Sequence, residues 1–303
     1  MRQIHALFDR RRMRIYPRII LAVYALAALA LLAASRHLVD PLGKPLGYDF
    51  ITFWSASRLT LEGQPAAAFD STAIGKAETV AVPGSGKLFL WHYPPTYQLA
   101  VTPLALLPYV PSYLCFTGAT LLVYLLSLRR LLDQPEPFLL LLAFPATFIC
   151  AFHGQNSFIS AAAFAAGILW LKSRPLASGL CFGLLAFKPQ LGLLVPVALI
   201  AARQWRPLAA AAATALAYAA LATWAFGLDL WHAFIQDGAV VRALLEKGLL
   251  PWAKMPTAFV FMRYFGVPEG LSYAMQFAVA LLAVAIVARV WRRCGPSRLA
   301  GAT

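Results

Sequence analysis

The residue best placed to carry chemistry is Asp49, which lies in a long polar stretch near the start of the chain, residues 43–95. Its neighbours Tyr48 and Phe50 are aromatic. An exposed carboxylate beside apolar residues can deprotonate a hydroxyl. Alternatively, Asp49 caps a helix that begins at Phe50, because aspartate is a favoured N-cap residue. Thr52 offers no capping-box partner for such a cap, so we favour the chemical interpretation.

A second polar group, His153-Gly154-Gln155-Asn156-Ser157, separates two apolar runs at 138–152 and 158–171. Glycine and asparagine are typical of a turn between helices, but a turn needs neither a histidine nor two carboxamides. The flanking runs are short, so this tip should be recessed in the membrane, where polar groups are costly and usually functional. We predict a functional site here.

The third group is Lys188-Pro189-Gln190, which separates the apolar runs 176–187 and 191–202. The lysine could snorkel to the level of the lipid head groups. Alternatively, it neutralises an anionic phosphate, Gln190 hydrogen-bonds a sugar or phosphate oxygen, and Pro189 opens the next helix. Four further side chains could add to a phosphate site, although each is also explained as a solvated or snorkelled group: Arg58, His92, Lys254 and Arg263.

The elements that position these groups are membrane helices. Of the 303 residues 61% are hydrophobic and 13% are charged, whereas roughly a quarter of residues are charged in soluble domains. Spanning the hydrocarbon layer takes about 20 apolar residues. We therefore predict an all-α fold, a single integral membrane domain over 1–303 with about eight crossings. The predicted crossings are 16–36, 112–128, 138–152, 158–171, 176–187, 191–202, 208–226 and 271–291.

The basic residues orient this bundle. They form small clusters at the ends of apolar runs, including Arg10–Arg18, Arg129-Arg130 and Arg292-Arg293. Basic residues are enriched in cytoplasmic loops, so both termini are expected in the cytoplasm. Most of the 12 acidic residues then fall on the outer side, which indicates a functional surface there.

Two long loops are predicted on that outer side, 37–95 and 227–254. Within the first, Phe50–Glu62 has apolar residues near helical spacing, with Phe53 and Trp54 on one side and Arg58 on another. This pattern predicts a helix lying in the membrane interface. Residues 96–107 are too short to cross comfortably and suggest a re-entrant or interfacial piece.

Several other functions are excluded by what the sequence contains. Binding nucleic acid needs a basic patch on one face, and the net charge of +14 is instead dispersed along the chain. No phosphate-binding loop, dinucleotide fingerprint, zinc-protease motif or nucleophile elbow occurs. The four cysteines are far apart, so neither a zinc site nor a redox motif is predicted. We expect no metal and no cofactor.

A set of short strings occurs in order along the chain. They are Tyr48-Asp49-Phe50, Phe53-Trp54-Ser55-Ala56-Ser57-Arg58-Leu59, Glu62-Gly63-Gln64-Pro65, Phe69-Asp70, Tyr93-Pro94-Pro95, Gly154-Gln155-Asn156, Lys188-Pro189-Gln190 and Lys254-Met255-Pro256-Thr257. Over about Asp49–Gly266 this set resembles the polyprenol-phosphate-sugar-dependent glycosyltransferases of family 87. Each string is short, and the order of the strings gives the resemblance its specificity.

The resemblance implies a GT-C fold, a polytopic helical bundle whose catalytic acid stands in the first extracytoplasmic loop. It implies an inverting enzyme that moves a hexose, often mannose, from a polyprenyl-phosphate donor to a lipid-linked or glycan acceptor. Asp49 would be the general base. The leaving phosphate would be bound by His153 or His92 with Lys188, Arg58 and Arg263; the sugar or acceptor would contact Gln155, Asn156, Gln190, Tyr48 and Tyr93.

Two other functions remain open at this point. A transporter or lipid flippase would hold ionisable residues near the middle of the bilayer and show inverted repeats. A non-catalytic membrane scaffold would tolerate replacement of Asp49 by asparagine. Here the polar groups gather at one edge of the apolar runs, which favours the transferase.

Overall fold

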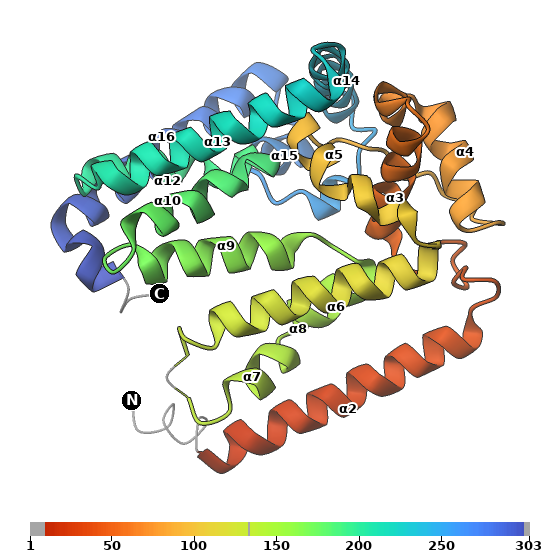
Figure 1. Ribbon diagram of the computed structural model, residues 1–303, viewed down its shortest axis with the longest axis horizontal. Helices are drawn as coiled ribbons and strands as arrows, with labels where there is room; N and C mark the ends of the chain where they lie inside the picture. Colours follow the sequence, from red (N-terminus) through yellow and green to blue (C-terminus); the bar gives the residue numbers. More distant parts are fainter. Residues whose placement is uncertain (1–9, 133, 300–303) are drawn as a thin grey trace. The chain divides into compact units, whose positions relative to one another are not determined.

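The computed structural model describes residues 10–132 and 134–299, and every regular element in these ranges is a helix (Figure 1). The predicted all-α class is confirmed. The chain forms two compact units that divide between Ala166 and Gly167, inside α9 (Ser157–Trp170). The predicted cytoplasmic positions of the two chain ends concern residues outside the described ranges.

Four helices are long and apolar enough to cross a membrane. They are α2 (Arg10–Ala34), α6 (Tyr109–Leu128), α13 (Trp205–Phe226) and α16 (Glu269–Leu299, with non-helical backbone at Gly295). They correspond to the first, second, seventh and eighth predicted crossings. Most of their side chains are not buried within the protein, as expected for helices that face lipid.

The other predicted crossings are shorter or broken. Residues 138–152 form α7 (Pro137–Ala143) and α8 (Pro145–His153). They separate at Phe144, which is extended with φ −65° and ψ 125°, because a residue before proline is disfavoured in the helical region. With 14 residues, α9 is about 21 Å long, short of a hydrocarbon layer of about 30 Å.

Residues 176–202 are divided in the same way. They form α10 (Pro175–Leu184), η3 (Leu185–Phe187), α11 (Pro189–Gly192) and α12 (Leu194–Ala201). Pro189 does open the helix after Lys188, as predicted. The eight-crossing arrangement stays a prediction.

The first unit is organised around α3 (Tyr48–Leu61). It packs against η1 (Pro65–Phe69), α4 (Ser71–Ala81), α5 (Pro95–Val101), η2 (Thr102–Leu106), α6 and α8. Phe53 is 1% exposed and Trp54 is 7% exposed. These two side chains are therefore packed inside the first unit, because the surrounding short helices cover them. The interfacial position of this helix stays a prediction.

Aromatic packing and buried hydrogen bonds hold α3 in place. The ring of Phe53 makes edge contacts with Trp91, Tyr93 and Tyr97, at centroid distances of 6.2, 5.5 and 5.2 Å. Such edge-to-face pairs are the preferred arrangement of aromatic rings. The indole of Trp54 also donates to the carbonyl of Leu107 at 2.9 Å.

Two helices lie in stretches that were predicted only as loops. Asp70 caps α4 by accepting the amide of Ala73 at 2.7 Å. In the second unit α14 runs from Asp229 to Glu246, and it is followed by η4 (Trp252–Lys254) and α15 (Ala258–Tyr264). The loop boundaries 37–95 and 227–254 thus enclose helical structure.

In the second unit α10 and α13 pack closely through glycine. A Cβ atom on Gly179 would lie 2.4 Å from the carbonyl oxygen of Pro207, and one on Gly183 would lie 2.5 Å from that of Ala211. Small residues four apart allow two membrane helices to approach to this degree. The spacing of these two glycines therefore fixes how α10 meets α13.

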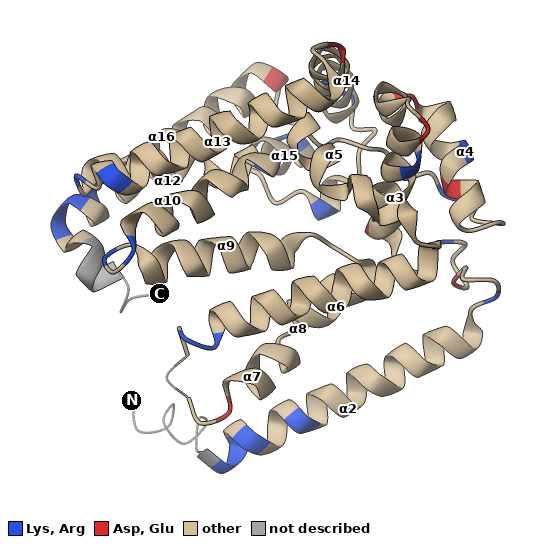
Figure 2. Ribbon diagram, viewed as in Figure 1, with Lys and Arg blue, Asp and Glu red and all other residues tan. Residues whose placement is uncertain are grey.

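In the first unit arginine residues gather at the start of α2 and the end of α6 (Figure 2). Arg14 and Arg18 near the start of α2 pair with Glu136, just before α7, at 3.0 and 3.1 Å. Arg129 and Arg130 follow the end of α6. Basic residues thus mark the start of α2 and the end of α6, and α3 follows the opposite end of α2.

Candidate functional site

Asp49 lies in the first turn of α3, and its side chain is 32% exposed. The helix begins one residue earlier than predicted, at Tyr48, and Gly47 is the N-cap, with φ 75° and no side-chain cap. The capping role considered for Asp49 is therefore wrong. The hydroxyl of Tyr109 donates to the carbonyls of Leu46 and Gly47, at 2.7 and 3.1 Å, and so fixes the start of the helix.

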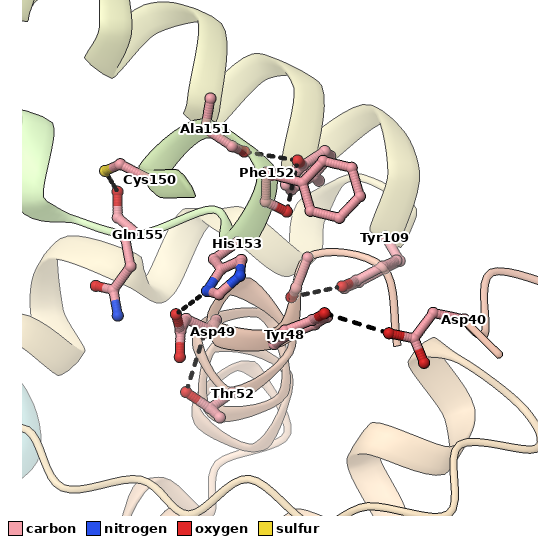
Figure 3. A network of polar contacts seen from close by, with 12 residues as sticks. Asp40, Tyr48, Asp49, Thr52, Tyr109, Cys150, Ala151, Phe152, His153 and Gln155 are labelled. Carbon is pink, nitrogen blue, oxygen red and sulfur yellow. Dashed lines mark hydrogen bonds and ion pairs between the residues drawn. The ribbon is translucent and has the colours of Figure 1, made fainter. Parts of the chain in front are cut away.

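His153 faces Asp49 from the last turn of α8 (Figure 3). Its Nδ1 lies 3.5 Å from Oδ2 of Asp49, and its side chain is 29% exposed. Both groups are thus reachable from outside while they contact each other. A carboxylate next to an imidazole is the pairing used to accept and hold a proton.

The helix ends suit the two groups. The N-terminus of a helix favours a negative charge, and the C-terminus favours a positive one. Asp49 occupies the first turn of α3, and His153 the last turn of α8. The fold therefore brings together a helix start and a helix end, each carrying the residue type that its dipole favours.

Gly154 makes this contact possible. It is the C-cap of α8, with φ 65°, a left-handed conformation that glycine adopts without steric cost. A Cβ atom on Gly154 would lie 2.5 Å from Cβ of Phe50 and 3.0 Å from the ring of Tyr113. No larger residue fits between the end of α8 and α3.

Tyr113 of α6 supports the same helix end. Its hydroxyl donates to the carbonyl of Ala151 at 2.7 Å and to that of Phe152 at 3.2 Å. The last carbonyls of a helix have no partner within the helix, so this hydroxyl both satisfies them and fixes the backbone beside His153.

Tyr93 and Asn156 lie on the same side of the first unit as Asp49. Burial raises the pKa of the Tyr93 hydroxyl to about 12, the neighbouring amide of Asn156 partly offsets that rise, and the charge of Asp49 adds to it. The hydroxyl therefore stays protonated at neutral pH. Asn156, which precedes α9, is 0% exposed, and its side-chain nitrogen and oxygen have no hydrogen-bond partner among the described residues.

Gln155 extends from the same tip (Figure 3). Its backbone amide donates to the carbonyl of Cys150 at 2.9 Å, which keeps the residue against α8. Its side-chain Oε1 is buried without a hydrogen-bond partner in the protein. Buried polar atoms are normally paired, so this oxygen indicates a position that water or a bound hydroxyl completes.

Tyr48 stands beside His153. Their ring centroids are 4.3 Å apart at an interplanar angle of 36°, and the hydroxyl of Tyr48 donates to Oδ2 of Asp40 at 3.2 Å. Burial raises the pKa of Tyr48, and the charge of Asp40 raises it further. Tyr48 is therefore a protonated donor at physiological pH.

Arg58 and His92 also lie in the first unit. Arg58 lies further along α3, about 13 Å along the helix axis from Asp49, and its Nε pairs with Oε1 of Glu62 at 2.8 Å. His92 is exposed on the segment that precedes α5. The guanidinium of Arg58 is thus paired with a residue one helical turn further along the chain.

The remaining predicted residues belong to the second unit. Lys188 is the N-cap of α11, and Gln190 is an exposed residue of its first turn. Arg263 of α15 donates to the carbonyls of Val267 and Glu246, at 3.1 and 3.3 Å. The guanidinium of Arg263 thus joins two backbone segments of its own unit.

The Lys254–Thr257 string also has a local structural role. Thr257 is the N-cap of α15, and its hydroxyl oxygen accepts the amide of Val260 at 3.1 Å. Across residues 10–132 and 134–299 no group of three His, Cys, Asp or Glu side chains is arranged to hold a metal ion.

Two contributors to the site were missed from the sequence. Tyr113 lies inside an apolar run, and nothing in that run distinguishes it from a membrane-interface tyrosine. The role of Asp40 in a turn could have been predicted, because it precedes Pro41 and Gly43 and aspartate commonly organises such turns through its side chain.

The comparisons with known proteins give one match. The model of glycosyltransferase family 87 matches residues 91–303. This match includes His153, Gln155, Asn156 and Lys188, whereas Asp49 precedes it. No curated protein and no solved structure matches the chain.

Proposed function

Because the chain belongs to glycosyltransferase family 87, we propose that it transfers a hexose, mannose in particular, from a polyprenyl-phosphate donor to a hydroxyl of a lipid-linked or glycan acceptor. Membership of this family supports glycosyltransferase activity but does not identify the donor or the acceptor. The donor and the acceptor are inferred from the family resemblance and from the apolar helices around the site. The observation that carries the proposal is the contact between Asp49 and His153, 3.5 Å apart.

Asp49 acts as the general base in this proposal. Its carboxylate takes the proton of the acceptor hydroxyl while that oxygen attacks the anomeric carbon of the donor sugar. The bond between the anomeric carbon and the phosphate oxygen breaks, and its electron pair leaves with the polyprenyl phosphate. A positioned base of this kind contributes on the order of 10² to 10⁴ in rate. One carboxylate is enough, because a phosphate leaves without being protonated, and a single displacement inverts the anomeric centre.

His153 holds the base in place. Paired through Nδ1, the imidazole orients one carboxylate oxygen and leaves the other for the acceptor. This role replaces the phosphate contact suggested for His153 by the family resemblance. A contact of 3.5 Å in the absence of substrate is compatible with it, because catalytic hydrogen bonds often tighten only when substrate binds.

The polar groups around the pair would bind sugar hydroxyls. The unpartnered Oε1 of Gln155 can accept a hydrogen bond, and the protonated hydroxyl of Tyr93 can donate one. A buried polar group that is completed only by substrate discriminates strongly against analogues that lack the matching hydroxyl. The phosphate contact of Lys188 and Gln190 stays a prediction from the family resemblance.

The site is proposed to open on the extracytoplasmic side. Basic residues mark the start of α2 and the end of α6, and cytoplasmic loops are enriched in basic residues. Asp49 follows the other end of α2. A polyprenyl chain lying in the bilayer would then present its sugar phosphate at the outer edge of the membrane.

The test is sugar transfer in membranes from radiolabelled polyprenyl-phosphate mannose, comparing the native chain with Asp49→Asn. The expected result is a loss of at least about 100-fold in transfer. Asp70→Asn is the matched control, because Asp70 is an acid of the same segment that caps α4 and asparagine caps a helix equally well. Equal transfer by the native chain and Asp49→Asn would refute the proposed base.

A further inference from the structure

Asp40 is a buried carboxylate that takes no part in the proposed chemistry. It is 5% exposed, and its Oδ1 accepts the backbone amides of Leu42 and Lys44, at 2.8 Å each. The amide of Asp40 donates to the carbonyl of Lys44, also at 2.8 Å. The turn therefore holds this carboxylate in one orientation, with Oδ2 directed elsewhere.

The partner of Oδ2 is Tyr48, whose hydroxyl donates to it at 3.2 Å (Figure 3). The tyrosine ring is tethered at its far end by this bond and at its near end by the start of α3. The ammonium of Lys44 lies 5.0 Å from the ring centroid, where a cation is attracted to an aromatic face. The ring of Tyr48 is thus restrained from three directions.

The restrained ring lies against His153, with 4.3 Å between the ring centroids. An imidazole turns about its side-chain bonds unless neighbouring groups occupy the space it would sweep. Tyr48 occupies that space on one side, and Asp49 contacts the imidazole through Nδ1. The orientation of His153 therefore depends on where the ring of Tyr48 is held.

The backbone before Tyr48 is also fixed at a cost. His37 and Leu38 have φ values of 49° and 67°, a left-handed conformation that is unfavourable for residues other than glycine. Bridges between Val39 and both Arg36 and Pro45 hold the segment. Strain of this kind persists only where the surrounding structure determines the conformation, so Asp40 is presented by a preformed loop.

We propose that Asp40 is a positioning residue for the Asp49–His153 pair: it tethers Tyr48, and the ring of Tyr48 holds the imidazole of His153 toward Asp49. This inference rests on the proposed function, because only then does the orientation of His153 affect a rate. Tyr48 acts here as a support for His153, in place of the sugar contact suggested by the family resemblance.

Two variants remove the tether from opposite ends. Tyr48→Phe deletes the hydroxyl and keeps the ring. Asp40→Ser keeps a short oxygen that can accept an amide of the turn, but lacks the second oxygen that reaches Tyr48. Each should lower kcat roughly tenfold, the loss of one hydrogen bond to a charged group, and should leave KM unchanged. Tyr48→Leu, which also removes the ring contact, should lower kcat further.

The double variant distinguishes a shared contact from two separate ones. Asp40→Ser combined with Tyr48→Phe should be no slower than either single variant, because both remove the same hydrogen bond. All rates are measured on purified protein with radiolabelled polyprenyl-phosphate mannose and are normalised to the amount that elutes as folded protein on size exclusion. Asp70→Asn again serves as the control.

The outcomes separate this inference from the proposed function. If Asp49→Asn abolishes transfer while Tyr48→Phe keeps the native kcat, the tether is irrelevant and the inference is overturned alone. A raised KM with native kcat in Tyr48→Phe would make Tyr48 a substrate contact and would also overturn it. Additive losses in the double variant would do the same. Native transfer by Asp49→Asn would instead overturn the proposed function.

Discussion

Gly154→Ala should separate Asp49 from His153 without touching either side chain. The added methyl would lie 2.5 Å from Cβ of Phe50, whereas carbon atoms in contact prefer about 3.5–4.0 Å. The end of α8 must therefore move away from α3 by about 1 Å. Alanine at φ 65° costs a further 1–2 kcal/mol or so.

The expected loss of stability is the sum of the steric clash and the backbone strain. Overpacking of a filled interior costs about 1–3 kcal/mol, so the total loss of stability should be on the order of 2–5 kcal/mol. A displacement of about 1 Å at a catalytic pair can lower a rate about 100-fold. We expect both a lower midpoint of thermal unfolding in detergent and a transfer rate that falls more than the folded fraction.

Gly63→Ala is the matched control for Gly154→Ala. Gly63 has φ 78° and nothing within 4 Å of the position that a Cβ atom would take. Alanine there therefore introduces the same backbone strain but no steric clash. The difference between the two variants measures the contact of α8 with α3. Equal unfolding midpoints and equal transfer rates for the two variants would show that Gly154 does not set the distance between Asp49 and His153.

Two further predictions concern stability away from the catalytic pair. Gly179→Ala places a Cβ atom 2.4 Å from a carbonyl oxygen of α13 and should lower the unfolding midpoint by the equivalent of about 1–3 kcal/mol. Gly192→Ala is the control, because the nearest atom to its added Cβ is 3.8 Å away, and it should leave the midpoint unchanged. An unchanged midpoint for both variants would argue against close packing of α10 on α13. Burial raises the pKa of Glu78 from 4.5 to about 8, with a backbone hydrogen bond from Phe89 opposing the rise. The folded protein then keeps a proton that the unfolded chain releases, so stability should fall as pH rises from about 5 to 8, by on the order of 3 kcal/mol at pH 7. Glu78→Gln should flatten this dependence, and unfolding midpoints measured across that range with the same slope in both proteins would contradict the assignment.

Hydropathy and proline positions predicted much of the secondary structure. The four long apolar runs became α2, α6, α13 and α16 because a helix satisfies its own backbone in lipid. The shorter runs were harder, since Pro145 divides one of them into α7 and α8. The number of apolar residues in a run does not reveal such a break, although the proline does.

The candidate tip at His153–Asn156 could be predicted because polar residues between two apolar helices have no ordinary reason to be there. Asp49 was identified by its position in a polar segment. Nothing in the spacing of these residues indicated that Asp49 and His153 would be within 3.5 Å of each other. That contact joins two helices from distant parts of the chain.

The sequence by itself determined the apolar character of the long helices and the residue types available for chemistry, because both depend on side-chain composition along a single segment. Only the tertiary structure decided that α3 is a buried helix, that Gly154 permits its contact with α8, and that Asp40 tethers Tyr48. Each of these depends on close contacts between segments far apart in the chain, and the strength of such contacts falls off within a few ångströms.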